Sequence, residues 1–470
     1  MPAPSTLIDR LAAHGQEHLV AFWDDLTAEG QATLASQIES VDFDLLASLF
    51  EGGEDEHDWA AAARRAEPPV AMRLSERDAG QGGGLGVTPG DAVAAGKAAL
   101  DAGKIGVLLV AGGQGSRLGF DHAKGLYPIG PVSDASLLQI HLEKAVALAK
   151  RHGHGVPVYL MTSPVTHDEQ VEFLTQHDRF GLAEDDLFFL CQGTMPALDR
   201  ETGKVLLSDK GSLFLGPDGH GGTVAALEKS GALDHMRSRG IEHLFYLQID
   251  NPLVPIGDAE TIGYHLATQS ELTSVAVAKE TPEEKLGNFV MIDDALHVIE
   301  YSDFPSDVAA TKDDAGALKF WAGSIAVHVF DVDFLRRSAA SASALPFHRA
   351  IKKAPCVSAS GDLVKPDEPN ALKFERFIFD LLPQAKNPIV VECAEEDVFA
   401  PLKNAPGAPK DTEEYVQRFM VDQHRRWLTA AGVEAPADTP IEISPLWALD
   451  AEAVARRAPE VAIDGPTYLR

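Results

Sequence analysis

Apolar residues along the chain gather in short continuous runs that alternate with longer segments of helical spacing. The runs predict buried β-strands at 107–110, 156–162, 187–192, 244–249, 272–278 and 389–393. Between several of them, as at Leu137–Lys150 and Thr223–Lys229, apolar residues recur every three or four positions, which predicts helices. Alternation of this kind from Ile105 to about Ala394 is typical of an α/β fold, in which helices cover both faces of a largely parallel sheet.

The two ends of the chain have different patterns. Residues 1–95 carry apolar residues at helical spacing, with Asp42 and Thr88 as expected helix N-caps. From about residue 401, a stretch rich in Pro, Gly, Lys and Asp predicts a surface loop, which one helix and a short proline-broken tail follow. We therefore expect three domains: an N-terminal helical domain at 1–95, a central α/β domain at 96–400 and a small β-rich C-terminal domain at 401–470.

The strand at Val107–Val110 runs into a loop that is almost free of side chains. The glycines of this loop are Gly112, Gly113, Gly115 and Gly119. A glycine-rich turn after a strand presents a row of backbone N–H groups, which suits phosphate oxygens, and Arg117 and Lys124 add positive charges beside it. The loop matches neither the dinucleotide fingerprint G-x-G-x-x-G nor the Walker sequence, so a tight structural turn is the alternative.

Composition restricts the classes of function. With 71 acidic and 40 basic residues the formal charge is −31, which argues against a surface for nucleic acid or for an anionic membrane. The three cysteines are odd in number and far apart, so we expect no disulfide framework and no zinc site. No apolar run is long enough to span a membrane, and the N-terminus lacks the apolar core of a signal peptide. These features predict a cytoplasmic protein.

Polar residues stand at the carboxyl ends of two further predicted strands. The amide of Gln192 can pair with the edge of a base, although an ordinary turn is the commoner explanation. The carboxylate of Asp250 can hold Mg²⁺ beside phosphate oxygens, with a turn or helix cap as the competing interpretation. A second glycine loop at 218–222 precedes a helix and contains His220, which can bind a ligand or lie at the surface.

Two later groups have side chains suited to a phosphorylated sugar. Glu300 and Tyr301 follow an alternating segment and can receive sugar hydroxyls, with a solvated strand end as the equal alternative. Cations late in the chain are Lys365, Lys373, Arg376 and Lys403. Most lysines are solvated surface charge, so only their sequence context favours a role.

Taken in order, these stretches resemble the eukaryotic-type UDP-N-acetylhexosamine (UDP-N-acetylglucosamine) pyrophosphorylases, a family of UDP-sugar pyrophosphorylases. The matching stretches within the candidate site are 111–119, 123–125, 192–193, 219–222, 249–251, 299–302, 365–367, 369–370, 373–377 and 399–404. Further likeness at 15–19, 22–23 and 442–446 extends the resemblance over nearly the whole chain. It implies a Rossmann-like, mixed but mostly parallel sheet flanked by helices, of the GT-A-like nucleotidyltransferase kind, with the catalytic domain at 96–400.

The resemblance also implies a role for individual residues. Nucleotide contacts are implied for Val110, Ala111, Gly112, Gly113, Gln192, Gly219 and Lys373. Sugar contacts are implied for His220, Gly287, Glu300, Tyr301, Trp321 and Phe377. Catalytic contacts with the phosphates are implied for Arg117, Lys124 and Lys403, and Asp250 is the implied ligand of Mg²⁺ or Mn²⁺.

The chain departs from the family pattern at a few positions. His220 stands where the family usually has Asn, and Trp321-Ala-Gly-Ser324 replaces an Asn-Ala-Gly-Asn run. An indole that points into the sugar pocket disfavours an acetamido group, whereas one that points into the core leaves the pocket intact. On sequence we favour a sugar range different from that of the N-acetyl-specific relatives. Ala123 replaces the family's proline before Lys124, where we expect less effect.

The expected reaction is uridylyl transfer, in which UTP and a hexose 1-phosphate give a UDP-sugar and pyrophosphate. The expected partners are these small molecules, and the protein is expected to be a monomer or a weak homo-oligomer. A non-catalytic UDP-sugar sensor on the same fold is the alternative, although it has no need of Lys124 or Asp250. An NAD-dependent dehydrogenase lacks support because the dinucleotide fingerprint is missing.

Overall fold

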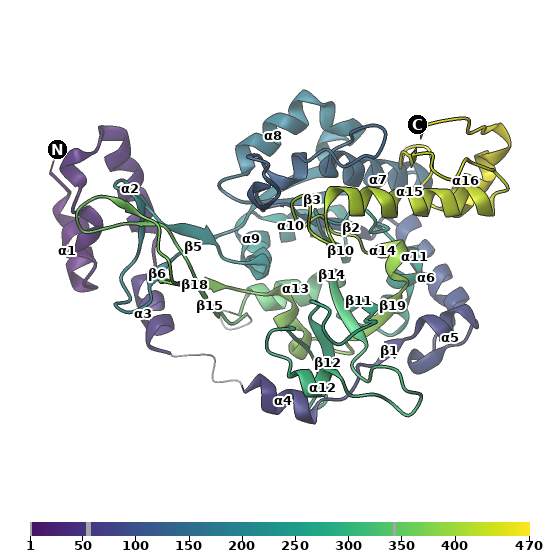
Figure 1. The fold of residues 1–470 in the computed structure, drawn as a ribbon, viewed down its shortest axis with the longest axis horizontal. Coiled ribbons are helices and arrows are strands. Elements are labelled where there is room, and N and C mark those ends of the chain that lie inside the picture. The colour runs from purple at the N-terminus through teal and green to yellow at the C-terminus, as the bar shows by residue number, and fades with distance from the viewer. Residues whose placement is uncertain (1, 53–57, 342–344) are drawn as a thin grey trace. The chain divides into compact units, whose positions relative to one another are not determined.

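The computed structural model describes residues 2–52, 58–341 and 345–470 (Figure 1). Contacts group the chain into two compact units. Unit 1 comprises Met1–Asp58, Gln192–Thr223 and Leu345–Ile378, and unit 2 comprises Trp59–Cys191, Val224–Ala344 and Phe379–Arg470. Each unit is thus built from three separate segments, whereas the three domains expected above follow the order of the sequence and stay a prediction.

Unit 2 contains a ten-stranded sheet, with the order β1-β19-β11-β14-β10-β2-β3-β4 along its main path and β12 and β13 off it. Figure 1 shows the central strands of this path side by side. The strands are β1 (Ala71–Met72), β2 (Ile105–Val110), β3 (Val158–Thr162), β4 (Leu187–Cys191), β10 (His243–Gln248), β11 (Leu272–Ala278), β12 (Asn288–Ile292), β13 (Ala295–Ile299), β14 (Ala322–Asp331) and β19 (Ile389–Cys393). All six strands predicted from apolar runs are confirmed to within about two residues at either end.

The sheet is mixed because β14 runs antiparallel to both of its path neighbours, β10 and β11. The other pairs along the path are parallel, from β10 through β2 and β3 to β4 and from β11 through β19 to β1. The predicted α/β fold with a mostly parallel sheet is therefore confirmed. The carboxyl ends of β2 and β10 lie together because Val110 pairs with Gln248, which brings the glycine loop beside Asp250.

Helices cover both faces of this sheet. The helices of unit 2 are α4 (Trp59–Arg65), α5 (Leu74–Asp78), α6 (Pro89–Asp101), α7 (Leu137–His152), α8 (His167–Gln176), α9 (Thr223–Lys229, which begins at the last residue of a unit 1 segment), α10 (Ala232–Arg239), α11 (Ala259–Ala267), α12 (Ser306–Ala309), α13 (Val332–Ala339), α14 (Glu395–Val398), α15 (Glu413–Ala430) and α16 (Ala451–Arg457). Helix α7 shares a buried apolar cluster with Val107 and Leu109 of β2. On the opposite face, His235 of α10 lies 5.7 Å from the ring of Tyr159.

Helices α6 and α11 pack so closely that only glycine fits at two contact positions. A Cβ on Gly96 would lie 1.8 Å from the carbonyl oxygen of Ala259, and a Cβ on Gly263 would lie 1.7 Å from that of Ala92. Thr88 caps α6 by accepting a hydrogen bond from the N–H of Asp91, as the sequence predicted.

The C-terminal region of unit 2 has its own apolar cluster. Helix α15 contributes Leu428, and the parallel strands β20 (Ile441–Ile443) and β21 (Thr467–Leu469) contribute Ile441 and Ile443. The expected helix after residue 412 and the short strands near the C-terminus are both present.

Unit 1 combines helices from the N-terminus with short strands from two later segments. Its helices are α1 (Ser5–Ala13), α2 (Ala28–Ser40) and α3 (Phe43–Glu51), and its strands are β5 (Thr194–Pro196), β6 (Leu198–Asp199), β7 (Leu207–Asp209), β8 (Ser212–Leu213), β9 (Leu215–Pro217), β15 (His348–Lys352), β16 (Cys356–Val357), β17 (Leu363–Val364) and β18 (Ala371–Glu375). One core joins the segments, since Leu11, Ile38 and Phe374 belong to the same buried cluster. Asp42 caps α3, as predicted.

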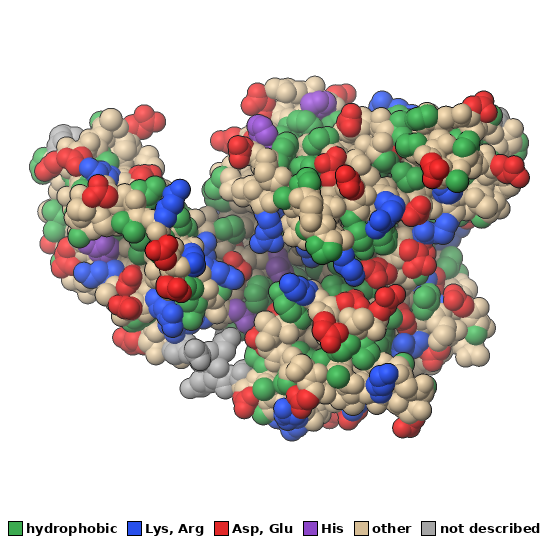
Figure 2. Space-filling view, viewed as in Figure 1, with side chains coloured by type: hydrophobic (Ala, Val, Ile, Leu, Met, Phe, Trp, Pro, Cys, Tyr) green, Lys and Arg blue, Asp and Glu red, His purple; other side chains and the backbone are tan. Residues whose placement is uncertain are grey.

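The surface carries both signs of charge. Figure 2 shows acidic side chains spread over the viewed face with basic side chains among them. Within the described ranges, no helix has the length and apolar character needed to cross a bilayer.

Candidate functional site

The glycine loop of unit 2 begins where β2 ends. The N–H of Ala111 still donates to the carbonyl oxygen of Met161 at 2.7 Å, and the chain then leaves the sheet. Gly115 has no room for a side chain, because a Cβ there would lie 2.7 Å from Phe120. In the described part of the chain, the N–H groups of Gly112 and Gly113 donate to no other residue. Two unused donors in a segment without side chains suit an anionic ligand.

Lys124 connects this loop with the carboxyl end of β10. Its backbone N–H donates to the carbonyl oxygen of Gly113 at 3.0 Å. Its Nζ donates to Oδ2 of Asp250 at 3.3 Å and to the carbonyl oxygen of Leu402 at 3.4 Å. The side chains of Lys124 and Asp250 are only 18% and 11% exposed. Since an ammonium group has three donors, one remains for a ligand.

Asp250 and Asn251 hold the segment that follows α14. The carbonyl oxygen of Asp250 accepts a hydrogen bond from the N–H of Leu402 at 2.8 Å. The amide of Asn251 donates to Val398 at 2.7 Å and accepts from the N–H of Ala400 at 3.2 Å. These contacts place Lys403 next to the Lys124–Asp250 pair, so three of the residues predicted from the sequence come from neighbouring segments.

Lys403 and Asp411 add opposite charges to this part of unit 2. The N–H of Lys403 donates to the carbonyl oxygen of Asp411 at 2.8 Å, and its Nζ lies 5.7 Å from the centre of the Phe399 ring. Burial raises the pKa of Asp411, the nearby lysines Lys403 and Lys410 lower it, and the charge of Asp250 raises it further. Sequence analysis did not single out Asp411, because it lies in a stretch with the composition of a surface loop.

Two residues of α7 hold the loop that carries Asp250. His141 and Lys144 are three positions apart and therefore face the same way. The Nε2 of His141 donates to the carbonyl oxygen of Ile249 at 3.1 Å. The Nζ of Lys144 donates to the carbonyl oxygens of Pro252 and, at 2.8 Å, of Val254. Burial lowers the pKa of His141 to about 3 and that of Lys144 to about 7. No motif in the sequence indicated either residue.

Arg117 is the remaining cation that the sequence placed at this loop. It lies on a single 3₁₀ turn, Ser116–Leu118, and its side chain is exposed. Gly119 ends this turn with a φ of +74°, in the left-handed region that favours glycine.

Residues predicted to contact a sugar lie around the β12–β13 hairpin of unit 2. The N–H of Ser324 donates to the carbonyl oxygen of Gly287 at 2.8 Å. A Cβ on Gly287 would lie 2.7 Å from Val298 and 3.2 Å from Oε1 of Glu300, so glycine keeps this position close to that carboxylate. Tyr301, the next residue, is 46% exposed. The structure therefore brings Gly287, Glu300 and Ser324 together.

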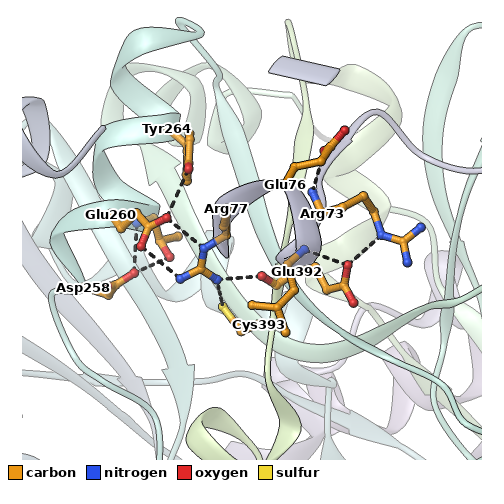
Figure 3. Close-up of polar contacts among 10 residues, drawn as sticks. Arg73, Glu76, Arg77, Asp258, Glu260, Tyr264, Glu392 and Cys393 are labelled. Atoms are coloured by element: carbon orange, nitrogen blue, oxygen red, sulfur yellow. Dashed lines mark hydrogen bonds and ion pairs between the residues drawn. The ribbon is translucent and has the colours of Figure 1, made fainter. Parts of the chain in front are cut away.

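Trp321 is buried and its ring is covered by an arginine. The guanidinium of Arg73 lies 3.8 Å from the centre of the indole, and Trp321 is 6% exposed. Arg73 in turn donates through Nε to Oε2 of Glu392 at 2.6 Å, and the N–H of Leu74 donates to the same oxygen at 3.0 Å. Figure 3 shows Arg73 and Glu392 joined in this way. The indole is thus part of the packing between α5 and the sheet.

Arg77, which lies within α5, extends the same anchorage. Arg77 forms a two-pronged ion pair with Glu260 at 2.8 and 2.9 Å and donates to the carbonyl oxygen of Glu392 at 2.7 Å (Figure 3). Its NH1 also lies 3.5 Å from the thiol of Cys393. Burial raises the pKa of that thiol to about 12, so Cys393 is protonated and inert at neutral pH. The contacts of Arg73 and Arg77 fix α5 on the sheet, and Arg73 packs on the ring of Trp321.

In unit 1, the second glycine loop and Gly193, which follows Gln192, lie against a buried carboxylate. Gln192 and Asp218 are both buried, at 6% exposure each. A Cβ on Gly193 would lie 2.6 Å from Asp218, and one on Gly222 would lie 2.1 Å from it. Burial raises the pKa of Asp218 to about 6, while nearby Arg376 lowers it. Both glycines are therefore required by the space that Asp218 occupies.

Two backbone N–H groups of the loop at 219–222 donate hydrogen bonds within the chain. The N–H of Gly221 donates to the carbonyl oxygen of Arg376 at 2.8 Å, and that of Gly222 to Gly219 at 3.0 Å. Gly219 has a φ of +85°, and a Cβ there would lie 2.3 Å from the oxygen of Arg376. These N–H groups are not available to an anion, in contrast to what the glycine-rich sequence suggests.

His220 lies in an aromatic stack of unit 1. Its ring centre is 5.4 Å from that of Phe377, whose other neighbour is His348 at 4.5 Å. The Nδ1 of His220 accepts a hydrogen bond from the N–H of Ile378 at 3.2 Å. Burial lowers the pKa of His220 to about 4, so the ring is neutral and carries its proton on Nε2. Phe377 and His220, both predicted to contact a sugar, are therefore in contact with each other.

Lys373 of β18 is the cation of unit 1 for which a nucleotide contact was implied. Its Nζ lies 4.9 Å from the centre of the Phe214 ring. The predicted site residues thus form two sets, one within each unit. The set in unit 2 contains Val110, Ala111, Gly112, Gly113, Arg117, Lys124, Asp250, Gly287, Glu300, Tyr301, Trp321 and Lys403, and the set in unit 1 contains Gln192, Gly219, His220, Lys373 and Phe377.

The residues around Asp250 fit a divalent cation that is shared with a ligand. Among the residues that the structure describes, no group of three or more His, Cys, Asp or Glu side chains is arranged to hold a metal. Mg²⁺ commonly takes one or two protein carboxylates and completes its shell with phosphate oxygens and water. Asp250 supplies one carboxylate beside the free N–H groups of the glycine loop, which suits a cation that enters with a phosphate.

Comparisons show that the chain is similar to known proteins over most of its length. The family described as UTP–glucose-1-phosphate uridylyltransferase matches residues 91–438. A UDP-N-acetylhexosamine pyrophosphorylase-like protein 1 from Xenopus tropicalis is 35% identical over 436 residues, which cover 90% of this chain and 84% of that protein. UDP-N-acetylglucosamine diphosphorylase 2 from Arabidopsis thaliana is 34% identical over 463 residues, with 94% and 89% covered.

Among solved structures, the uridine diphosphate N-acetylglucosamine pyrophosphorylase from Trypanosoma brucei, in complex with an inhibitor, has a similar fold. It superposes with a TM-score of 0.83 at 26% identity and covers 100% of this chain and 98% of that one. The likeness in sequence and in fold therefore extends over nearly the whole chain.

Proposed function

The chain belongs to the UTP–glucose-1-phosphate uridylyltransferase family, and from this premise we propose that it joins UTP to N-acetylglucosamine 1-phosphate. Uridylyl transfer is the activity of the family, and the products are a UDP-sugar and pyrophosphate. The observation that carries the proposal is the contact of Lys124 with Asp250 and Leu402 at the end of a glycine loop with free N–H groups. The choice of sugar rests on the relatives and on the packing of Trp321.

In the proposed reaction, the sugar phosphate oxygen attacks the α-phosphorus of UTP in line and pyrophosphate leaves. Both reactants are anions, so the task of the protein is to align them and to reduce their repulsion. The N–H groups of Gly112 and Gly113 donate to oxygens of the nucleotide, and the third donor of the Lys124 ammonium stabilises charge on the phosphates. Lys403 and Arg117 add positive charge beside the same loop. No covalent intermediate on the protein is needed.

Asp250 is the residue that would hold Mg²⁺ or Mn²⁺. A bound divalent cation supplies charge neutralisation between phosphate oxygens. The role of Lys124 beside Asp250 is then to keep the carboxylate oriented, because its Nζ donates to Oδ2 of Asp250 at 3.3 Å. Asn251 fixes the same loop through its contacts with Val398 and Ala400, so the carboxylate is positioned before a ligand arrives.

The packing of Trp321 supports an acetamido sugar. Arg73 covers the indole at 3.8 Å and Glu392 holds Arg73, so the guanidinium packs on the ring of a buried tryptophan. The expectation of a different sugar range depended on an indole that points into the pocket. With the indole held by Arg73, we infer that the departures that bear on the sugar are Ser324 and His220, and both keep a polar group that can donate a hydrogen bond.

The experiment is a panel of sugar 1-phosphates with UTP and Mg²⁺, with pyrophosphate release as the signal. We expect N-acetylglucosamine 1-phosphate to have the highest kcat/KM, and the Lys124→Ala variant, which lacks the ammonium, to serve as the matched control. Preference for glucose 1-phosphate by more than tenfold contradicts the proposed sugar. Binding of UDP-sugar without pyrophosphate release from any member of the panel favours the non-catalytic sensor instead.

We also infer a cytoplasmic location. Its support is that the three cysteines, Cys191, Cys356 and Cys393, are all free thiols in the structure, which suits a reducing compartment. Fractionation of cells that express the tagged protein tests this inference, and recovery in a secreted or lumenal fraction contradicts it.

A further inference from the structure

The residue before Lys124 is held by a carboxylate from a neighbouring helix. The N–H of Ala123, a residue 1% exposed, donates to Oε2 of Glu169 at 2.7 Å. The other oxygen of Glu169 contacts Nδ1 of His122. We propose that Glu169 is a positioning residue that fixes the 122–123 backbone so that Lys124 reaches Asp250 and Leu402. This inference rests on the proposed role of Lys124 in the reaction.

Helix α8, which carries Glu169, is itself fixed to the end of β3. The hydroxyl of Thr162 lies 2.8 Å from Nδ1 of His167, and the N–H of Ser163 donates to the hydroxyl of Thr166 at 3.2 Å. Because α8 starts from the rigid edge of the sheet, a carboxylate on its first turn has a defined position. Glu169 can therefore hold the loop at a defined position relative to the sheet.

The same helix also holds the other end of the glycine loop. Gln170, which is fully buried, donates through Nε2 to the carbonyl oxygen of Ala111 at 3.0 Å. Ala111 is where the chain leaves β2, and Ala123 is where it arrives at Lys124. Two consecutive residues of α8 thus bind the two ends of a loop in which a Cβ on Gly113 would meet no atom within 4 Å.

The contact matters because the donor is buried. Without Glu169, the N–H of Ala123 loses its acceptor, and a buried unpaired N–H is unfavourable enough to drive a local rearrangement. Lys124 follows directly, and its own N–H is bonded to Gly113 at 3.0 Å. A shift of the 122–123 backbone therefore moves the lysine ammonium relative to Asp250, where small displacements of a catalytic group reduce turnover.

The backbone of Ala123 provides a sharp test. Its φ of −57° and ψ of 132° fall in the range that proline adopts. Proline at 123 fixes the same φ covalently and has no N–H that needs an acceptor. Its ring would occupy the position of the hydrogen bond to Glu169, so the substitution is best made together with removal of that carboxylate. If Glu169 acts by fixing this backbone, proline replaces its effect.

Four variants are compared in steady-state kinetics with UTP and the preferred sugar 1-phosphate. We expect Glu169→Ala to lower kcat about tenfold with KM changed less than about threefold. Glu169→Gln keeps an oxygen acceptor and should stay within about threefold of the parent. The double variant Glu169→Ala, Ala123→Pro should recover kcat to within about threefold. Glu172→Ala, on the exposed side of the same helix, is the matched control and should leave kcat unchanged.

Thermal unfolding midpoints of all four variants separate positioning from general damage. The inference is supported if Glu169→Ala loses turnover with its midpoint within a few degrees of the control and proline restores the rate. Parent-like kcat in Glu169→Ala, or loss of rate that proline does not recover, overturns it. Lys124→Ala is assayed in parallel. If that variant keeps full turnover, the proposed role of Lys124 fails, whereas loss of turnover there with a parent-like Glu169→Ala shows that only the positioning inference is wrong.

Discussion

Lys124 and Asp250 are 126 positions apart in the sequence, yet the ammonium of one lies 3.3 Å from the carboxylate of the other. Parallel pairing of β2 with β10 brings them together, since Val110 lies opposite Gln248 and the two chains leave the sheet at the same edge. Leu402 completes the arrangement by accepting from Lys124 and donating to Asp250. The contact of Lys124 with Asp250 therefore depends on the register in which β2 pairs with β10.

The first prediction concerns the charge of Lys124. Lys124→Ala removes an ammonium that we propose to face the phosphates, and loss of one such charge typically costs on the order of 10²–10³ in rate. We expect kcat to fall by this factor while binding of UDP-sugar, measured by calorimetry, stays within about threefold. A variant with normal turnover would remove Lys124 from the chemistry.

The second prediction concerns the metal. Asp250→Asn replaces a carboxylate by an amide, which is a weaker ligand for a hard cation. We expect the Mg²⁺ concentration for half-maximal activity to rise at least tenfold and kcat to fall on the order of 10². The check is a Mg²⁺ titration of the initial rate, with Asp411→Asn as the comparison at a nearby carboxylate. If the titration and rate match the parent, Asp250 acts only as a turn residue.

The third prediction concerns the pH dependence of stability. Burial lowers the pKa of Lys144 to about 7, whereas the unfolded lysine titrates near 10.5. Between these values the unfolded state binds more protons, so the contribution of Lys144 to the free energy of unfolding rises with pH, by at most about 1.4 kcal/mol per pH unit. A neutral amine still has the two donors that Pro252 and Val254 require.

Urea unfolding of the parent and of Lys144→Met at pH 6, 7.5 and 9 measures this effect. We expect the difference in unfolding free energy, parent minus variant, to increase from pH 7 to pH 9 and to change little below pH 7. A difference that is constant over this range shows that the folded lysine keeps an ordinary pKa.

The sequence predicted six strands of the ten-stranded sheet because each of these is a short apolar run, and it did not predict β1, β12, β13 or β14. The strand β14 was missed, although Ile325, Val327 and Val329 alternate within it. The reason is that glycine and small residues interrupt its start, and a register shift at Val275–Ala276 breaks the regular pairing with β11. Antiparallel insertion of this strand depends on partners that no local pattern reveals.

The sequence indicated those candidate site residues whose type is distinctive at their position. It did not indicate the residues that hold them in place through packing and hydrogen bonds. Lys124 and Asp250 stand beside glycines or at strand ends, which the sequence displays. Glu169 and Lys144 are ordinary helical residues whose acceptors and donors come from distant backbone. Trp321 has a packing partner that no local pattern indicated, since Arg73, contributed from far upstream, covers its ring.

The fourth prediction separates packing from sugar choice at Trp321. Trp321→Phe removes part of the contact with Arg73 and leaves space in a buried position, so we expect the free energy of unfolding to fall by about 1–3 kcal/mol. The ratio of kcat/KM for N-acetylglucosamine 1-phosphate over glucose 1-phosphate should change by less than about threefold. Ser324→Ala is the contrasting variant, for which we expect a change of that ratio. A ratio that moves more than tenfold in Trp321→Phe places the indole in the pocket.

The last prediction concerns the base. Gln192 is buried and its amide offers both a donor and an acceptor, the pair that the edge of uracil requires. A mismatched base leaves buried polar groups unpaired, and a site built on such hydrogen bonds rejects the wrong ligand strongly. We expect UTP to exceed ATP in kcat/KM by at least about 10³, and Gln192→Ala to reduce that ratio by about tenfold or more, mainly through loss of activity with UTP. Gln192→Glu is the second variant, since it keeps the volume and an acceptor oxygen at this buried position but loses the two amide donors. Equal rates of the parent with UTP and ATP, or an unchanged ratio in both variants, would show that Gln192 does not select the base.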